Sequence, residues 1–335
     1  MKTKIAINGF GRIGRNAFKV ARERDDVEVV AINDLTDNQT LAHLLKYDSS
    51  YGPYEREVVA DENSLTVDGK QVLITAEKDP SALPWGEQGV DIVIESTGRF
   101  TKAEDAKMHL TAGAKKVVVS APAKGDGVDT VVLSVNDEVV DDGGDVFSNA
   151  SCTTNCITPV AAVMLREFGI EKAMMTTIHS YTADQNLQDG PHKDLRRARA
   201  AAENIVPTTT GAAQAAGQAI PQLQGIFDGL SIRVPTPVVS LSDFTFVLGQ
   251  DVTVEQVNEA ITAATKEPGF SGIMSVTDEP LVSRDLMGDS HSAVVDTSLT
   301  QVCAGNLVKI VAWYDNEWGY SNRLVELVGR LSERL

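Results

Sequence analysis

The segment Ile5–Gly14, which reads IAINGFGRIG, decides the fold of the first half of this chain. Its apolar start, Ile5–Asn8, predicts a short strand, and Gly9, Gly11 and Gly14 follow it at the spacing G-x-G-x-x-G. Apolar residues then recur with the 3.6-residue period of a helix, at Ile13, Ala17, Val20 and Ala21. A glycine-rich turn of this kind brings backbone close to a pyrophosphate at the positive end of a helix. The segment therefore predicts a dinucleotide site.

One acidic residue strengthens this interpretation. Asp34 lies 20 positions after Gly14, at the end of the second predicted strand, Val27–Ile32. A carboxylate at that place accepts hydrogen bonds from an adenosine ribose and repels a 2′-phosphate. The pattern favours NAD over NADP as the cofactor. It disfavours the alternative, a tight strand-to-helix turn that binds no ligand.

Further strand signals continue to residue 150. Runs rich in β-branched residues recur at Asp91–Glu95, Lys116–Ser120 and Val131–Leu133. Runs that are apolar on both faces are typical of buried parallel strands, and helices between them indicate βαβ units. We therefore expect residues 1–150 to form an α/β dinucleotide-binding (Rossmann) domain with a doubly wound sheet.

The pattern changes after Ser148. Strand signals become longer and lie closer together, at Leu230–Val234, Val238–Leu248 and Leu307–Tyr314. Within them, Ser242–Phe246 alternates polar and apolar residues, which favours an antiparallel sheet covered on one face. Helical periods are expected over 152–168, 254–266 and 317–333. We expect an α+β catalytic domain with a largely antiparallel sheet over 151–316, while the C-terminal helix, 317–335, completes the first domain.

The run Ala150–Asn155 (ASCTTN) contains Cys152, the residue with the most direct chemical meaning. Apolar residues repeat after it with helical spacing, which places the thiol at a helix start, where unpaired N–H groups favour a thiolate. His179 follows 27 positions later, after the strand-like run Ala173–Ile178. A thiol with an imidazole that takes its proton predicts an activated nucleophile.

Other interpretations of Cys152 remain open. A free cysteine is often only a buried packing residue. Cys156 lies one helical turn later, so the two thiols also fit a redox couple or half of a metal site. The remaining cysteine, Cys303, is remote, and three cysteines are too sparse for a structural zinc site, so we expect no metal.

Composition excludes several classes of protein. The chain has 335 residues, of which 42% are hydrophobic, so two ordinary domains with real cores are expected. A formal net charge of −17 argues against nucleic acid as a partner. No apolar run approaches a membrane span, and the start of the chain has no signal-peptide pattern. Sparse cysteines favour a reducing compartment, so we expect a cytoplasmic protein.

Taken together, the motifs resemble those of phosphorylating glyceraldehyde-3-phosphate dehydrogenases along nearly the whole chain. The run SNASCTTN at Ser148–Asn155 is highly specific to that family. The other matching segments, in order, are NGFGRIGR (Asn8–Arg15), NDL (Asn33–Leu35), ESTG (Glu95–Gly98), SAP (Ser120–Pro122), DLRRARA (Asp194–Ala200), PTTTGAA (Pro207–Ala213), RVPTP (Arg233–Pro237) and WYDNEWGYSNR (Trp313–Arg323).

The resemblance implies a reaction in which glyceraldehyde 3-phosphate, inorganic phosphate and NAD give an acyl phosphate, 1,3-bisphosphoglycerate, and NADH. Cys152 would add to the aldehyde to form a hemithioacetal, and His179 would act as general base while hydride leaves. The resulting thioester would be attacked by phosphate. The family likeness also implies a homotetramer, with a role in glycolysis and gluconeogenesis.

The resemblance further implies two anion sites and a cofactor site. The attacking phosphate would be bound by Ser151, Thr153, Thr210 and Gly211, with help from Arg197. The substrate's own phosphate would be bound by Thr182 and Arg233. On the cofactor side, the implied residues are Gly9, Gly11, Arg12, Ile13, Gly14, Asp34, Lys78, Ser120, Asn316 (nicotinamide carboxamide) and Tyr320 (beside the ring). From the residues alone, helix caps, turns, a structural ion pair and core packing remain the alternatives.

Some positions depart from the family pattern. Gln214 stands where lysine is expected, and Lys78 where arginine is common. Gly190 precedes Pro191 where NAD-using members often carry leucine, so a side chain that crowds a 2′-phosphate is missing. We therefore expect NAD as cofactor with some secondary use of NADP. The alternatives are an erythrose-4-phosphate dehydrogenase, an NADP-preferring gluconeogenic enzyme, and a non-enzymatic scaffold.

Overall fold

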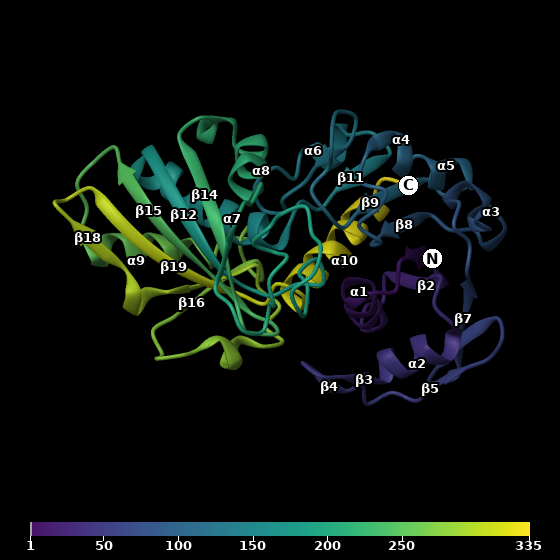
Figure 1. Ribbon diagram of the computed structural model, residues 1–335. Coiled ribbons are helices and arrows are strands. Elements are labelled where there is room, and N and C mark those ends of the chain that lie inside the picture. The colour runs from purple at the N-terminus through teal and green to yellow at the C-terminus, as the bar shows by residue number, and fades with distance from the viewer. Residues whose placement is uncertain (1) are drawn as a thin grey trace. The chain divides into compact units, whose positions relative to one another are not determined.

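The computed structural model describes residues 2–335 and divides into two compact units. The first unit comprises the chain up to Val131 together with Asp137–Ala150 and Ser321–Leu335, and the second comprises Val132–Asn136 and Ser151–Tyr320. Figure 1 labels the elements of both units along the chain. Each unit has its own sheet, so each is described separately.

The first unit is built on a nine-stranded sheet with the order β10-β11-β9-β8-β1-β2-β7-β6-β5. The strands from β10 to β7 are parallel, and only the hairpins that add β6 and β5 are antiparallel. The bounds are β1 Thr3–Asn8, β2 Val27–Asn33, β5 Val58–Ala60, β6 Ser64–Val67, β7 Lys70–Thr75, β8 Ile92–Glu95, β9 Lys116–Val119, β10 Asp129–Thr130 and β11 Val146–Ser148. A small separate hairpin joins β3 Tyr47–Asp48 to β4 Gly52–Pro53.

Helices connect these strands, and they pack on the sheet through their apolar faces. Helix α1 buries Ala17, Phe18, Val20 and Ala21, and it contacts β1 and β2. The helices of this unit are α1 Arg12–Arg22, α2 Asn38–Lys46, α3 Trp85–Gln88, α4 Ala103–Ala106, α5 Met108–Thr111 and α6 Val139–Asp142, with the short 3₁₀ turn η1 Pro80–Ala82. The last helix, α10 Trp318–Ser332, begins in the second unit and belongs to the first from Ser321 onward.

The second unit is built on an eight-stranded sheet in the order β13-β14-β12-β15-β19-β17-β16, with β18 also paired to β19. Most pairs are antiparallel, and β12–β14 and β16–β17 are the parallel exceptions. The bounds are β12 Ile170–Ser180, β13 Val206–Thr208, β14 Phe227–Val234, β15 Ser240–Leu248, β16 Met274–Thr277, β17 Ala293–Asp296, β18 Gln301–Cys303 and β19 Leu307–Tyr314.

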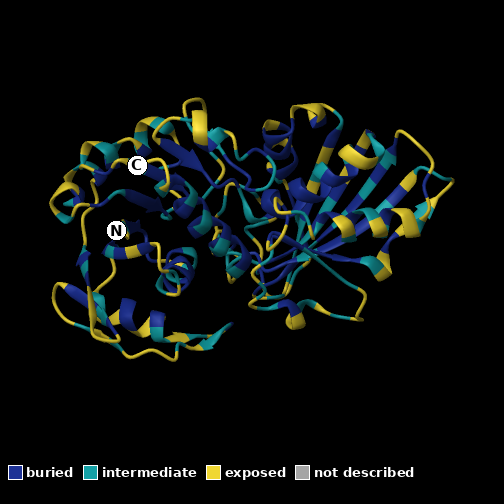
Figure 2. Cartoon of the chain, turned by 180° about the vertical axis from the view of Figure 1, so that it is seen from behind, coloured by how far each residue is buried: buried dark blue, intermediate teal, exposed yellow. Residues whose placement is uncertain are grey.

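One face of this second sheet is covered by helices. Strand β15 alternates strictly between buried and half-buried residues, and its inward Phe244 and Phe246 join a core with α7 Cys152–Phe168. Two further helices, α8 Ala212–Ala219 and α9 Val254–Ala264, pack against α7. The 3₁₀ turns are η2 Pro221–Leu223, η3 Ser283–Leu286 and η4 Thr297–Leu299. Figure 2 shows buried residues along the strands of both units and exposed residues on the connecting turns.

The expected fold class is confirmed: a mostly parallel α/β sheet in the first unit and a mostly antiparallel sheet in the second. One predicted strand and one predicted strand boundary are wrong. Val131–Leu133 is not a strand, because β10 ends at Thr130 and the chain turns there, with Ser134 at φ 80°. The strand expected from Val238 starts only at Ser240, because Val239 has a left-handed backbone with φ 71°, which breaks an extended run.

Candidate active site

The glycine turn after β1 is shaped by close backbone contacts. Gly9 has φ 93°, and a Cβ placed on it would lie 2.8 Å from the carbonyl carbon of Ser96. A Cβ on Gly14 would lie 2.1 Å from the carbonyl oxygen of Gly9. Gly11 caps α1 without any side-chain hydrogen bond to the first turn. The start of α1 thus carries no side-chain cap, which is the type of helix end at which a pyrophosphate binds in dinucleotide sites.

Asp34 lies at the end of β2, where the carboxyl end of the strand meets the turn. One of its oxygens accepts from the backbone N–H of Phe10 at 2.8 Å and the other from Thr36 at 2.9 Å. Both bonds fix the carboxylate while lone pairs remain for ribose hydroxyl groups.

A cavity of about 290 Å³ opens beside these residues within the first unit. It is lined by Asn8, Gly9, Gly11, Asn33, Asp34, Leu35, Glu77, Lys78, Ser96, Thr97, Arg99 and Phe100. Of the expected cofactor residues, Gly9, Gly11, Asp34 and Lys78 therefore share one cavity. The Arg12 side chain forms an ion pair with Asp48 at 3.1 Å. Ser120 does not line the cavity.

Cys152 and His179 are brought together in the second unit. Cys152 is the first residue of α7, and His179 is the next-to-last residue of β12. The Sγ atom of Cys152 lies 3.5 Å from Nε2 of His179. Ser151 caps the helix by accepting from the Thr154 backbone N–H at 3.0 Å. The helix start and the strand end thus place a thiol within reach of an imidazole.

The hydrogen bonds of His179 define its role. Its Nδ1 lies 2.7 Å from the carbonyl oxygen of Ser180, which only accepts, so Nδ1 carries the proton. Burial, together with repulsion from the Arg233 guanidinium, lowers the pKa of His179 to about 3. The neutral ring therefore turns an unprotonated Nε2 toward the thiol, as a general base requires.

Two opposing influences act on the thiol. Burial raises the pKa of Cys152 above its ordinary value, and the positive charge of Arg233 and the backbone N–H of Thr153 offset only part of this rise. In contrast, Cys156 is fully buried, and burial raises its pKa far above that of an ordinary thiol. Of the two cysteines in α7, Cys152 is therefore the one whose thiol can transfer its proton to a nearby group.

Alkylation by iodoacetamide tests this electrostatic description. Because only the thiolate reacts, we expect the rate at Cys152 to rise about tenfold per pH unit up to its pKa. His179, with a pKa of about 3, stays neutral above pH 5 and adds no second inflection. Arg233→Leu removes a charge that lowers the thiol pKa, so its profile shifts to higher pH. Mass spectrometry of the labelled cysteines measures the rate, with buried Cys156 as the unreactive control. A flat profile between pH 6 and 9 would contradict this description and indicate a stable thiolate–imidazolium pair.

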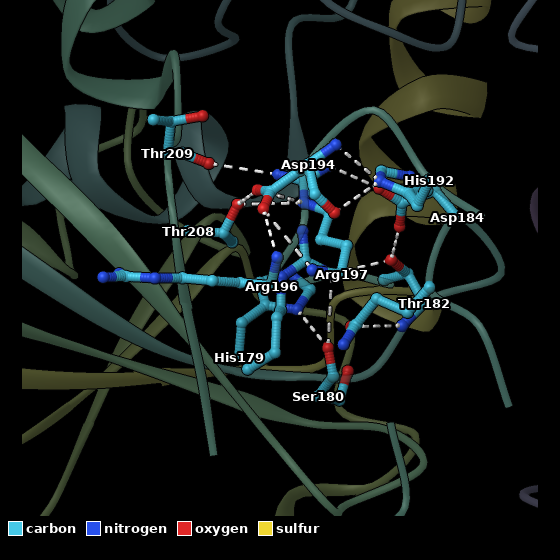
Figure 3. Close-up of polar contacts among 12 residues, drawn as sticks. His179, Ser180, Thr182, Asp184, His192, Asp194, Arg196, Arg197, Thr208 and Thr209 are labelled. Carbon is cyan, nitrogen blue, oxygen red and sulfur yellow. Dashed lines mark hydrogen bonds and ion pairs between the residues drawn. The ribbon is translucent and has the colours of Figure 1, made fainter. Parts of the chain in front are cut away.

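A second cluster surrounds Asp184, as Figure 3 shows. The carboxylate accepts from the Thr182 hydroxyl and from Nη1 of Arg197 at 2.5 Å. Arg233 donates from Nη1 to the same Thr182 hydroxyl at 2.7 Å. Burial alone would raise the pKa of Asp184, but the Thr182 hydroxyl and the two guanidinium groups hold it below its usual value. Two cations and a hydroxyl thus converge on one anion.

Arg197 is held on its other side by residues of β13 and the loop after it. Its Nε donates to the Thr208 hydroxyl at 2.9 Å, and Nη2 donates to the Thr209 carbonyl at 3.2 Å. The Thr208 hydroxyl donates in turn to Asp194 at 2.6 Å. Arg197 is therefore oriented by the Thr208 side chain of β13 and by the Thr209 backbone, and Figure 3 shows this group of contacts.

The remaining residues expected to bind phosphate lie at helix starts. Thr210 accepts from the Ala212 N–H at 3.2 Å, and Gly211 caps α8 without a side-chain bond. Thr153 lies in the first turn of α7, and α7 packs against α8. The Thr153 hydroxyl is bonded to the buried Tyr314 hydroxyl at 2.9 Å. The Thr153 hydroxyl is thus already engaged within the second unit.

Asn316 has an oriented amide. Its Oδ1 accepts from the hydroxyl groups of Ser180 and Ser240, both at 3.0 Å. With both lone pairs of Oδ1 occupied, the amide presents Nδ2 as a donor. Tyr320, 5% exposed, is the last residue of the second unit.

Sequence reasoning missed three of these contributors. Asp184, Tyr314 and Ser240 each contact an expected site residue. Only Asp184 had a local signal, as an acid two positions after Thr182.

Fold and site together define a class of protein: an NAD-dependent oxidoreductase that acts on an aldehyde. Comparison with known proteins shows the family. The family model described as "Glyceraldehyde 3-phosphate dehydrogenase, NAD binding domain" matches residues 3–103, and the model of the C-terminal domain matches residues 151–316. The chain belongs to the glyceraldehyde 3-phosphate dehydrogenase family, which confirms the resemblance found in the motifs.

Curated relatives agree over the full length. A glyceraldehyde-3-phosphate dehydrogenase of Geobacillus stearothermophilus is 55% identical and covers 100% of this chain and 99% of its own. One of Priestia megaterium is 56% identical, with 98% and 97% covered. Glyceraldehyde-3-phosphate dehydrogenase 1 of Bacillus subtilis is 53% identical, with 100% and 99% covered. These names do not favour the erythrose-4-phosphate or NADP-preferring alternatives.

Within residues 2–335, no group of three or more His, Cys, Asp and Glu side chains gathers as metal ligands would. In the same part of the chain, no helix has both the length and the apolar character needed to cross a membrane.

Proposed function

We propose that this chain catalyses the phosphorylating oxidation of glyceraldehyde 3-phosphate to 1,3-bisphosphoglycerate, through a thioester on Cys152. The contact that carries the proposal is the 3.5 Å approach of Cys152 Sγ to His179 Nε2. A thiol at a helix start, beside a neutral imidazole and two groups of phosphate-type donors, suits acyl transfer to phosphate.

The thiol and the imidazole perform the proton transfers. Nε2 of His179 takes the thiol proton as Sγ bonds to the aldehyde carbon, and it returns that proton to the oxygen of the hemithioacetal. NAD, held by the cofactor residues described below, would supply the acceptor for the hydride of that carbon. As hydride leaves, Nε2 removes the hydroxyl proton and a thioester forms. A phosphate oxygen then attacks the thioester carbon, and the Cys152 thiolate leaves.

Two donor groups are assigned to the two phosphates. Thr182 and Arg233, which already share a hydrogen bond, bind the phosphate of the substrate. The attacking phosphate is bound at the starts of α7 and α8 by Ser151, Thr153, Thr210 and Gly211, with Arg197 as the cation. Asp184 fixes Thr182 and Arg197 in place between them.

The cofactor residues follow the strand-to-helix turn. Gly9, Gly11, Gly14 and the backbone of Arg12 and Ile13 bind the pyrophosphate, and Asp34 binds the adenosine ribose. Asn316 donates from Nδ2 to the nicotinamide carboxamide, and Tyr320 packs beside the ring. Lys78 and Ser120 complete the cofactor contacts. Residues 1–150 with 317–335 act as the NAD-binding domain, and residues 151–316 act as the catalytic domain.

The working form is a homotetramer in the cytoplasm, active in glycolysis and gluconeogenesis and without nucleic acid as a partner. The support for an oligomer is exposed apolar surface on the second unit, with Leu187, Leu195, Ile205 and Met174 each at least 70% exposed.

NADH formation from glyceraldehyde 3-phosphate, with and without inorganic phosphate, tests the proposal. We expect production to depend strongly on phosphate, because the thioester needs phosphate to leave the enzyme quickly. Replacing NAD with NADP gives a slower reaction, because the Asp34 carboxylate repels a 2′-phosphate. If erythrose 4-phosphate were oxidised equally fast with and without phosphate, the assignment would be overturned in favour of a dehydrogenase that releases an acid. Faster turnover with NADP than with NAD would overturn the cofactor assignment.

A further inference from the structure

A carboxylate is buried in the first unit beneath the cofactor cavity, and the reaction described above does not use it. Glu95, at the end of β8, is 1% exposed. Its neighbours His109 and Trp85 are both fully buried. The residues expected to bind the cofactor do not include any of the three. A buried charge is expensive unless hydrogen bonds satisfy it, so its partners indicate its role.

Four donors converge on Glu95. Oε1 accepts from the backbone N–H of Thr97 at 2.8 Å and from its hydroxyl at 2.5 Å. Oε2 accepts from Nδ2 of Asn8 at 2.5 Å and lies 3.0 Å from Nε2 of His109. Asn8 Nδ2 and His109 Nε2 are 3.5 Å apart because both bond to the same oxygen of Glu95.

The direction of the His109 bond is fixed by Trp85. The indole N–H of Trp85 only donates, and it lies 3.0 Å from Nδ1 of His109. Nδ1 must therefore accept, which leaves the proton of the neutral ring on Nε2, facing Glu95. Both oxygens of Glu95 thus receive donors only, which is the arrangement of an ionised carboxylate.

A second chain of bonds runs from Glu95 across the sheet. Oδ1 of Asn8 accepts from Nδ2 of Asn33 at 2.7 Å. Oδ1 of Asn33 accepts from the backbone N–H of Glu77 at 2.8 Å, and Nδ2 also donates to the Glu77 carbonyl at 2.9 Å. These residues lie at the ends of the adjacent strands β8, β1, β2 and β7. Asn8, Asn33, Glu77 and Thr97 all line the cavity.

We propose that Glu95 is a positioning residue for NAD: its buried carboxylate, bonded to a His109 ring that Trp85 orients, sets the orientation of Asn8, Asn33 and Thr97, three polar residues that line the cofactor cavity. The charge of Glu95 orients the amide of Asn8, and Asn8 orients the amide of Asn33. Asn33 in turn bonds to the backbone N–H and carbonyl of Glu77. This inference goes beyond the chemistry at Cys152 and does not depend on it.

The need for a carboxylate follows from counting donors. A glutamine at position 95 has one acceptor oxygen and one donor nitrogen. With its oxygen toward Asn8 and His109, the N–H of Thr97 loses its acceptor. If the glutamine oxygen points toward Thr97, its NH₂ group faces the Nε2–H of His109, so two donors meet. The His109 proton cannot move to Nδ1, because Nδ1 accepts from Trp85. Either orientation leaves a donor unsatisfied.

The loss reaches cofactor affinity because of where Thr97 lies. In the free Glu95→Gln variant, an N–H of Thr97 that has lost its acceptor still lies beside an open cavity, where water can satisfy it. NAD fills that cavity and excludes the water, so the unsatisfied donor becomes costly only in the complex.

The test is the dissociation constant of NAD for Glu95→Gln in the full chain, measured by calorimetry together with the thermal unfolding midpoint. We expect a rise of about tenfold or more in the dissociation constant, with kcat at saturating NAD within about threefold. Val117→Ala is the matched control, since it truncates a buried side chain of β9 in the same unit, away from the cavity. Where Val117→Ala lowers the thermal unfolding midpoint by a similar amount, its dissociation constant for NAD should stay within about twofold of the parent value.

A second pair of variants tests the same idea if Glu95→Gln does not fold. In His109→Gln, the side chain still accepts from Trp85 and donates to Glu95, whereas in His109→Leu it does neither. We expect His109→Gln to retain NAD affinity and His109→Leu to lose it severalfold. Unchanged affinity in Glu95→Gln, an equal loss in Val117→Ala, or equal binding by the two His109 variants would overturn the proposal. Because NAD binding is read directly, these outcomes are independent of whether Cys152 forms a thioester.

Discussion

Cys152→Ser is expected to lower NAD-coupled aldehyde oxidation by about four orders of magnitude or more. A serine hydroxyl at the start of α7 has nearly the same shape as the thiol but a far higher pKa, so the nearby imidazole cannot ionise it to a useful extent. Because the cofactor cavity is lined by residues of the first unit only, NAD binding should remain at the parental level. NADH production and a separate NAD titration measure the two properties.

The neighbouring cysteine gives a matched control. Cys156 lies one turn further along α7 and is fully buried, and the Ser242 hydroxyl lies beside its thiol within hydrogen-bonding reach. Cys156→Ser thus introduces a hydroxyl that has a bonding partner, and turnover should stay within about threefold of the parent. Near-normal turnover in Cys152→Ser, or equal loss in both variants, would refute the role of Cys152 as nucleophile.

Local sequence patterns predicted the parts of this molecule that local physics determines. The turn at Gly9–Gly14 can form because Gly9 and Gly14 have no Cβ, which would collide with nearby backbone. The glycine spacing in the sequence indicates this requirement. The start of α7 at Cys152 follows from a cap residue and a regular apolar period. The position of His179 at a strand end follows from the β-rich run before it.

Contacts between distant segments were beyond such patterns. Asn316 is oriented by Ser180 and Ser240, which lie 136 and 76 positions away and reach it only because β12 and β15 are neighbours in the sheet. The chain of bonds from Glu95 to Asn33 likewise needs the strand order β8-β1-β2. Single serines and asparagines carry no periodic signal, so nothing in the sequence distinguishes these from surface residues.

Backbone conformation explains the errors in strand boundaries. Val239 is β-branched and follows Val238, so β propensity favours a strand through both. The structure instead gives Val239 a left-handed backbone immediately before Ser240, whose hydroxyl accepts from the Ser180 N–H at 3.1 Å and donates to Asn316. Strained backbone of this kind is retained where surrounding contacts fix it, and it recurs beside functional groups.

His179→Asn is the second variant with a large expected effect, a loss of about 10²- to 10⁴-fold in kcat. The substitution removes the proposed general base, and the ring that packs edge-on to Tyr314 is lost with it. Since His179 is neutral across the working pH range, its loss removes a proton acceptor and no positive charge. The variant should therefore recover part of its rate as pH rises, because hydroxide then deprotonates the thiol. A pH profile of kcat for parent and variant measures this recovery.

The same substitution at another histidine separates chemistry from packing. His291 lies in the second unit, is half-buried, and bonds to Asp289 at 2.8 Å. His291→Asn should leave kcat within about twofold of the parent and leave the pH profile unchanged. If His179→Asn kept the parental kcat, or lost rate without any recovery at high pH, the imidazole would be a packing residue against Tyr314. The proton of Cys152 would then have to leave by another route, and the Arg233 guanidinium, which favours the thiolate by its charge alone, would be the main activating group.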